Sequence, residues 1–241
     1  MSGARRVVIA DRAALIAEFV AAVDSAVSDA TPRGAFSMAV PGGSAAEQLL
    51  PALAHANLPW NYVHLFWCDE RGVPADDADS NAGLLMRLWK RTPALAHAQL
   101  HPMPATDPDR ASAAARYARE LESICGSPPT LDMVLLGVGE DGHVASLFPG
   151  RAYRGGDVSV VAVSDAPKPP PERMSLTFSV LSRARAVIVA AFGTSKAAVM
   201  SSALAGTTNT PVARVLHEAP SALVLLDRDA GALIDTHLES R

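Results

Sequence analysis

Short apolar runs alternate along the chain with segments in which apolar residues recur every three or four positions. The run Arg5–Ala10 is rich in β-branched residues, and the segment Arg12–Val27 shows helical spacing behind Asp11, a good N-cap residue. The same pattern predicts elements to the end of the chain. We expect helices at about Ser44–His55, Ser80–Arg91 and Pro108–Ile124, and strands at Ala35–Val40, Tyr62–Trp67, Leu131–Leu136, Val158–Val163, Ala186–Ala191, Ala213–Leu216 and Ala222–Leu226.

The predicted strands are apolar throughout and are separated by helices. This arrangement favours an α/β fold with a parallel sheet covered by helices on both faces. The proline-rich break at 167–171 lies within the alternation and is interpreted as a loop, so we expect one domain spanning residues 1–241. Ligands of such folds bind beyond the carboxyl ends of the strands. The segments to examine therefore follow Val40, Trp67, Leu136 and Ala191.

Composition supports a folded protein and argues against several kinds of partner. Of the 241 residues, 49% are hydrophobic and 19% are charged, which supplies a core and argues against disorder. The net charge of -4 argues against nucleic acid and anionic membranes as partners. The two cysteines form no C-x-x-C motif and are expected to be reduced. No apolar run approaches the roughly 18 residues of a membrane span, and the N-terminus lacks a signal-peptide pattern, so we expect a cytoplasmic protein.

A Pro-Gly-Gly-Ser sequence follows the strand that ends at Val40 and opens the next helix. Gly42 and Gly43 let the backbone approach an anion closely, and a helix N-terminus offers unpaired N–H groups. Ser44 adds a hydroxyl group. The segment is equally compatible with a plain turn and an N-cap, and it lacks the lysine of a P-loop.

Asp69, Glu70 and Arg71 follow the strand that ends at Trp67. Two carboxylates and a guanidinium at the end of a buried strand indicate a binding or catalytic site. A solvated loop with a local ion pair would have the same composition, so the motif alone leaves both interpretations open.

A glycine-rich loop, GVGEDGH, follows the strand that ends at Leu136. Its glycines spell G-x-G-x-x-G, and Asp165 lies near the position that a dinucleotide site requires. That interpretation also needs a long helix after the third glycine, and Pro149 and Gly150 interrupt the segment within a few residues. We therefore interpret the loop as one that presents His143 as a general base.

Lys196 lies at the start of a further helix, after the strand that ends at Ala191. A lysine in a first turn opposes the helix dipole, and a bound anion would remove the conflict. Arg173, just past the proline-rich loop, is a candidate second cation, although alone it would be interpreted as surface charge. His97 and His101 have helical spacing but are followed by prolines and have no third ligand, so no metal site is predicted.

These segments, in this order, resemble the 6-phosphogluconolactonases: PGGS, WCDERGVP…DSN, LLGVGEDGHVASLFPG, Arg173 and FGTSKAA. The resemblance covers essentially the whole chain, and DGHVASLFPG is its most specific part. It implies a Rossmann-like parallel sheet. It also implies hydrolysis of 6-phospho-D-glucono-1,5-lactone to 6-phosphogluconate in the oxidative pentose phosphate pathway, with no cofactor or metal. Pro41 and Cys68 depart from the commoner family residues and remove no required group.

The resemblance implies a role for each candidate residue. His143 is the expected general base, Asp141 holds its tautomer, and Arg71 stabilises the oxyanion or orients the lactone. Asp69 orients Arg71 or a sugar hydroxyl. The expected phosphate ligands are Gly42, Gly43, Ser44, Arg173 and Lys196.

Two alternatives stay open at this point. The glucosamine-6-phosphate deaminases of the same superfamily share several of these motifs. Their loop carries a glutamate of the ring-opening apparatus where this chain has Phe148, which weakens that alternative. The other is a regulator that binds sugar phosphates without catalysis. We expect a monomer or a weak homodimer whose partner is the small-molecule lactone.

Overall fold

The computed structural model describes residues 4–53, 56, 58–90, 96–153 and 158–234. A seven-stranded sheet forms its centre, and every pair of neighbouring strands in it is parallel. The strand order is β1 (Ala4–Ala10), β10 (Ser221–Asp227), β9 (Ala186–Ala191), β6 (Met133–Gly137), β2 (Phe36–Val40), β3 (Val63–Trp67) and β5 (Gln99–His101).

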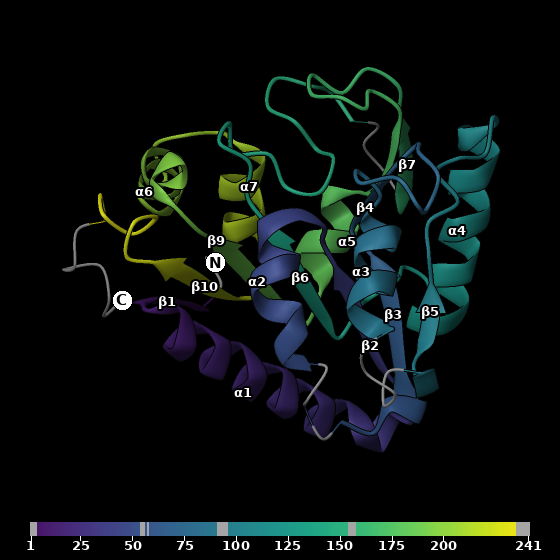
Figure 1. Cartoon of the computed structure of the whole chain (residues 1–241), viewed down its shortest axis with the longest axis horizontal. Coiled ribbons are helices and arrows are strands. Elements are labelled where there is room, and N and C mark those ends of the chain that lie inside the picture. Colours follow the sequence, from purple (N-terminus) through teal and green to yellow (C-terminus); the bar gives the residue numbers. More distant parts are fainter. Residues whose placement is uncertain (1–3, 54–55, 57, 91–95, 154–157, 235–241) are drawn as a thin grey trace.

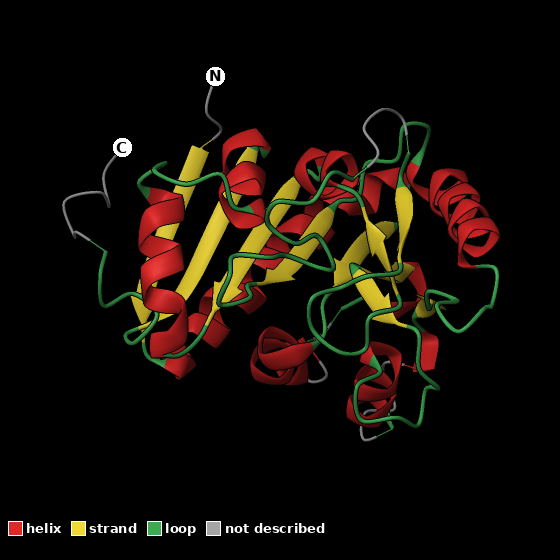
Figure 2. Cartoon of the chain, turned by 90° about the horizontal axis from the view of Figure 1, so that it is seen from above, coloured by secondary structure: helices red, strands yellow, loops and turns green. Residues whose placement is uncertain are grey.

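Helices cover both faces of this sheet, which confirms the predicted α/β class (Figures 1 and 2). Of the predicted helices, α1 begins behind the side chain of Asp11, which accepts a hydrogen bond from Ala14 N. The predicted helix ends at His55 and Arg91 lie outside the described residues. The helices are α1 (Arg12–Ala30), α2 (Gly43–Leu53), α3 (Asn81–Trp89), α4 (Arg110–Cys125), α5 (Phe178–Arg183), α6 (Ala197–Leu204) and α7 (Pro211–Glu218), with 3₁₀ turns η1 (Thr31–Arg33), η2 (Trp60–Tyr62) and η4 (Thr194–Lys196).

A second, antiparallel sheet was not expected from the sequence. It consists of β4 (Asp69–Arg71), β8 (Arg173–Leu176) and β7 (Val160–Val163), in that order. The apolar run at 158–163 was predicted as part of the parallel sheet and instead supplies β7. Only Cys68 separates β4 from β3, so the small sheet begins where the large one ends (Figure 1).

One predicted strand, Ala213–Leu216, is wrong, because the segment lies inside helix α7. Pro211 is at the first helical position, where its missing N–H is harmless, and Thr210 takes the N-cap position. A segment of four residues is too short to show a period, and here Ala213, Val215 and Leu216 lie on the buried face of an amphipathic helix.

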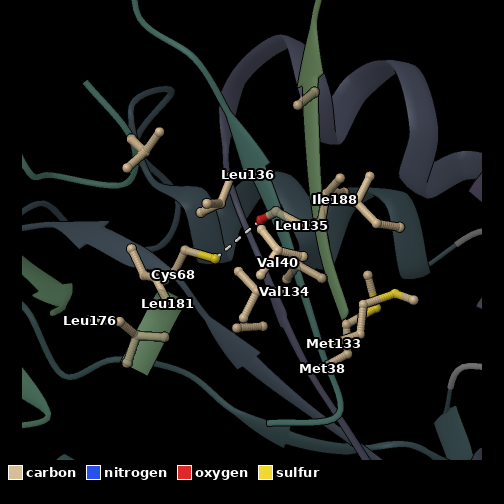
Figure 3. Packing of buried hydrophobic residues seen from close by; sticks show 14 of the residues in the cluster. Met38, Val40, Cys68, Met133, Val134, Leu135, Leu136, Leu176, Leu181 and Ile188 are labelled. Atoms are coloured by element: carbon tan, nitrogen blue, oxygen red, sulfur yellow. Dashed lines mark hydrogen bonds between the residues drawn. The ribbon is translucent and has the colours of Figure 1, made fainter. Parts of the chain in front are cut away.

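The core is built around β6, whose Leu135 and Leu136 are fully buried. Figure 3 shows Cys68 against this strand, where its Sγ lies 3.2 Å from the carbonyl oxygen of Leu135. Burial, with the nearby charge of Asp69, raises the pKa of the Cys68 thiol well above its ordinary value, as expected for an inert core cysteine. Because these strands run parallel, their carboxyl ends lie at one edge of the sheet.

A buried carboxylate stabilises the opposite edge of the sheet. Asp132, just before β6, accepts hydrogen bonds from the backbone N–H and hydroxyl of Ser37 and from Arg33, and Arg185 lies 3.4 Å away. We expect Asp132→Asn to lower the free energy of unfolding by about 2–4 kcal/mol, because an amide N–H₂ would face these donors. Urea denaturation followed by circular dichroism measures the change.

The matched control is Asp24→Asn on the exposed side of α1, which should change the free energy of unfolding by less than about 0.5 kcal/mol. Equal effects of the two substitutions would show that the Asp132 network contributes no special stability.

Candidate functional site

The Pro-Gly-Gly-Ser segment carries the chain from β2 into α2 in a shape that requires glycine. Gly43 has a φ of +63°, in the left-handed region. A Cβ atom on Gly42 would lie 1.7 Å from Oδ1 of Asn81, so no side chain fits there. The start of α2 therefore packs closely against Asn81 of α3. The first N–H groups of a helix have no partner within it, as an anion cradle needs.

A polar cavity of about 120 Å³ opens beyond the carboxyl ends of β2 and β6. Seven of the nine predicted site residues line it. A larger groove of about 630 Å³ between α4 and β7 is lined mainly by alanines and aliphatic residues, so we place the chemistry in the smaller cavity. The seven residues are Gly42, Gly43, Ser44, Asp69, Arg71, His143 and Arg173.

The imidazole of His143 is held by its own loop. Its Nδ1 lies 2.5 Å from Oδ1 of Asp141, the eighth predicted residue, which also accepts the backbone N–H of His143 at 3.3 Å. A Cβ atom on Gly139 would lie 2.0 Å from Nδ1, so glycine is needed beside the ring. With Nδ1 occupied, Nε2 is the nitrogen that the described structure leaves for substrate.

Burial and charge act in opposite directions on this pair. Burial lowers the pKa of His143, and Asp141 and Asp69 oppose that shift without reversing it. Burial acts to raise the pKa of Asp141, but the hydrogen bonds and the charge of His143, together with a backbone hydrogen bond of Asp141 itself, hold the pKa below its ordinary value. The arrangement therefore favours a neutral imidazole beside an ionised carboxylate, which is the state a general base needs.

The short strand β4 points alternate side chains in opposite directions. Asp69 and Arg71 line the cavity, whereas Glu70 does not. Asp69 is buried and accepts a hydrogen bond from the Ser146 hydroxyl at 2.6 Å, with Asn81 Nδ2 at 3.2 Å. Arg71 donates from Nη1 to the carbonyl of Asp79 at 2.6 Å.

The Nε atom of Arg71 is buried and has no hydrogen-bond partner among the described residues. The side chain of Arg71 also lines the cavity, so its guanidinium is a candidate donor to a ligand there.

Glu70 has a structural role that sequence reasoning left undecided. Its carboxylate accepts hydrogen bonds from the backbone N–H groups of Arg71, Asn81 and Ala82, at 2.6–2.9 Å, and from the Ser80 hydroxyl. Burial raises its pKa, and these hydrogen bonds act against that shift. Glu70 thus fixes the start of α3 and the Asp79 carbonyl that Arg71 contacts.

We expect Glu70→Gln to lower both stability and activity. The amide places an N–H₂ group against backbone donors, which should reduce the free energy of unfolding by about 1–3 kcal/mol. The start of α3 would shift, and the Asp79 carbonyl would no longer hold Arg71. Urea denaturation and kcat/KM measure the two effects, with Glu47→Gln on exposed α2 as the control. A destabilised variant with unchanged kcat/KM would show that Glu70 does not help to position Arg71.

Sequence reasoning also missed Asn81, which joins two parts of the site. Its Nδ2 donates to the backbone oxygen of Asp69 at 2.8 Å, and its Oδ1 lies against Gly42. The only signal was its place after Asp79-Ser80 in a family-like motif. The contact itself depends on the fold, because Asn81 is at the start of α3 and Asp69 is in β4.

Arg173 is buried and tightly held rather than a free surface cation. Its Nε donates to the carbonyl of Pro170, and its Nη2 donates to those of Lys168 and Pro169. Its Nη1 lies 3.4 Å from the Ser146 hydroxyl. Burial lowers the pKa of Arg173. The predicted proline-rich loop therefore wraps around this side chain, and the one hydrogen bond of Nη1, at 3.4 Å, is the longest that the guanidinium makes.

Lys196, the ninth predicted residue, lies beside the cavity and is not among its described lining residues. Its Nζ is 3.9 Å from Oε1 of Glu140, in the loop of His143. Burial lowers the pKa of Lys196, and so does the charge of Lys168, which acts on His143 in the same direction. Lys168 is thus a further cation near the site. Sequence reasoning missed it, and the only signal in the sequence was its position in the proline-rich loop.

The described residues offer little support for a metal or dinucleotide site. No group of three or more His, Cys, Asp or Glu side chains in the described ranges is placed to hold a metal ion. After Gly142 the chain forms turns and a bridge between Val144 and Leu147, where a dinucleotide site has a long helix. No helix of the described chain is long and apolar enough to cross a membrane.

Comparisons with known proteins agree on one family. A family model described as glucosamine-6-phosphate isomerases/6-phosphogluconolactonase matches residues 10–225. The chain is 37% identical to a 6-phosphogluconolactonase of Mycobacterium tuberculosis over 225 residues, covering 88% of this chain and 90% of the relative.

Solved structures show the same fold. A 6-phosphogluconolactonase from Trypanosoma brucei aligns with a TM-score of 0.82 and 26% identity, covering 97% of this chain and all of the other. A monomeric glucosamine-6-phosphate deaminase aligns with a TM-score of 0.77 at 18% identity, over 95% and 99% of the two chains, which shows the shared fold alone.

Proposed function

The chain belongs to the glucosamine-6-phosphate isomerase/6-phosphogluconolactonase family, and from this membership we propose that it hydrolyses 6-phosphoglucono-δ-lactone to 6-phosphogluconate. The observation that carries the proposal is His143, paired with Asp141, in a cavity that Arg71 and Arg173 also line. This arrangement combines a base for water with cations for an anionic ester substrate. Relatives that align with this chain over 90% of their own length are named 6-phosphogluconolactonase.

In the proposed reaction, Nε2 of His143 takes a proton from water as the water oxygen bonds to C1 of the lactone. The guanidinium of Arg71, which lines the cavity, stabilises the oxyanion that develops on the carbonyl oxygen. The bond from C1 to the ring oxygen then breaks, and the leaving oxygen takes the proton from His143. Asp141 keeps Nε2 as the reactive nitrogen, and Asp69 orients Arg71 or a sugar hydroxyl.

The phosphate of the substrate would bind at the start of α2. The N–H groups of Gly42 and Gly43 and the hydroxyl of Ser44 supply hydrogen bonds there. We propose that Nη1 of Arg173 and the ammonium of Lys196 neutralise its charge. Binding this non-reacting group positions the ester for attack.

Proton release measured by pH-stat on adding fresh lactone tests the proposal. We expect release well above the spontaneous rate. Binding of 6-phosphogluconate without acceleration would favour the regulator instead. Release of ammonia from glucosamine 6-phosphate would favour the deaminase activity, which we do not expect, because Phe148 cannot relay a proton.

Some expectations about the whole protein stay proposals. We propose that residues 1–241 form a single domain that works in the cytoplasm as a monomer or weak homodimer, without nucleic acid as a partner. Light scattering after size-exclusion chromatography measures the oligomeric state.

A further inference from the structure

Phe148 packs against two residues that line the cavity, His143 and Arg173. Its ring centroid is 4.7 Å from that of the His143 imidazole, and the guanidinium carbon of Arg173 is 5.5 Å from the same ring. The residue is 2% exposed, so its ring keeps water from the faces that it covers. One buried apolar ring therefore packs against both the imidazole and the guanidinium.

The backbone around Phe148 is held by hydrogen bonds. Its N–H donates to the hydroxyl of Tyr153 at 2.6 Å, and that hydroxyl donates to the carbonyl of Ser146 at 3.2 Å. The side chain of Ser146 is in turn bonded to Asp69 in β4. The ring is thus fixed to the same framework as the cavity.

The imidazole is enclosed on three sides. Asp141 occupies Nδ1, the backbone of Gly139 blocks the neighbouring edge, and Phe148 packs at 43° to the ring plane. Without Phe148, the ring could rotate away from Asp141 into the space left behind. The packing therefore selects the orientation that presents Nε2.

Charges on several elements act on the imidazole besides this packing. Asp141 in its own loop and Asp69 in β4 favour the protonated ring, and Lys168 in the proline-rich loop disfavours it. Arg173 in β8 packs against the same Phe148 ring. Burial is the largest influence and lowers the pKa of His143, and Phe148 contributes directly to that burial.

We propose that Phe148 is a positioning residue for the proposed reaction: it orients His143 toward the lactone and, by keeping water off the ring, maintains the neutral base. The inference rests on the proposed function. Sequence analysis used Phe148 only as evidence that the ring-opening glutamate of the deaminases is missing. The inference adds a function for the Phe148 ring itself in the lactonase reaction.

The test compares Phe148→Leu with Phe19→Leu, a control that removes a ring of equal size from the fully buried face of α1. For Phe148→Leu we expect the acid limb of the kcat/KM profile to move to higher pH. At pH values on that limb, the loss of kcat/KM in the variant relative to the wild type should be roughly threefold larger than the loss on the alkaline plateau. For Phe19→Leu we expect an unchanged profile with reduced stability.

A proton NMR titration of the His143 ring supplies a readout that does not depend on turnover. The resonance is assigned by its loss in His143→Gln. We expect the Phe148→Leu imidazole to titrate at higher pH than the wild-type ring. An unchanged titration and acid limb would overturn the inference even if activity fell. If the wild type lacks lactonase activity, the proposed function fails, whereas the titration still reports whether Phe148 sets the state of the ring.

Discussion

The substitution His143→Ala is expected to lower kcat for lactone hydrolysis by about 10²–10⁴-fold, with a much smaller change in KM. The imidazole is the group in the cavity that combines a carboxylate partner on one nitrogen with a second nitrogen left for water. Alanine removes the base and leaves the phosphate cradle and the cations in place. Initial rates by pH-stat, corrected for spontaneous hydrolysis, measure the effect.

The matched control is His217→Ala, because His217 is exposed on α7. It should hydrolyse lactone at the wild-type rate. Circular dichroism and thermal melting establish that both variants are folded. A folded His143→Ala variant with full activity would assign the base to another group.

The next largest effect is expected for Arg71→Ala, with kcat reduced by about 10²–10³-fold. Its guanidinium is anchored through Nη1 to the Asp79 carbonyl, while Nε is buried without a partner in the described structure. A donor held in this way needs no reorganisation when charge develops on the carbonyl oxygen. The same pH-stat assay, run over a range of lactone concentrations, separates kcat from KM.

Two further variants sharpen this result. Arg71→Lys keeps the positive charge and loses the fork of N–H donors, so it should recover only part of the lost rate. Arg119→Ala, on the exposed side of α4, is the control and should leave kcat unchanged. Full activity in Arg71→Lys would show that charge alone suffices, and full activity in Arg71→Ala would remove Arg71 from the mechanism.

Much of the fold was predictable because buried parallel strands have a strong sequence pattern. The apolar runs that became β2, β3, β6 and β9 were recognised within one or two residues of their observed bounds. The small antiparallel sheet was not, since β4 carries two acids and an arginine and has no apolar pattern. Its strand geometry comes from pairing with β8, which lies about a hundred residues later in the chain.

The site shows the same division. Residues such as Ser44, Asp69 and His143 were found because each follows a strand, and the topology brings those ends together. The carboxylate partner of His143, Asp141, was also found, because it lies in the same loop. The partner of Asp69 was not found. Ser146 meets Asp69 across 77 positions of sequence, and no local pattern encodes such a contact.

The three-residue strand β4 sets a limit on how this enzyme can be redesigned. Since Asp69 and Arg71 face the cavity only through strand alternation, inserting or deleting one residue here would exchange them with the buried Glu70. Residues of β4 can therefore be substituted, but the number of residues in the strand has to stay the same. Variation in length belongs in the proline-rich loop, provided its carbonyls still receive the Arg173 guanidinium. An engineer seeking a new lactone specificity should therefore build from that loop and leave the spacing of the acidic strand fixed.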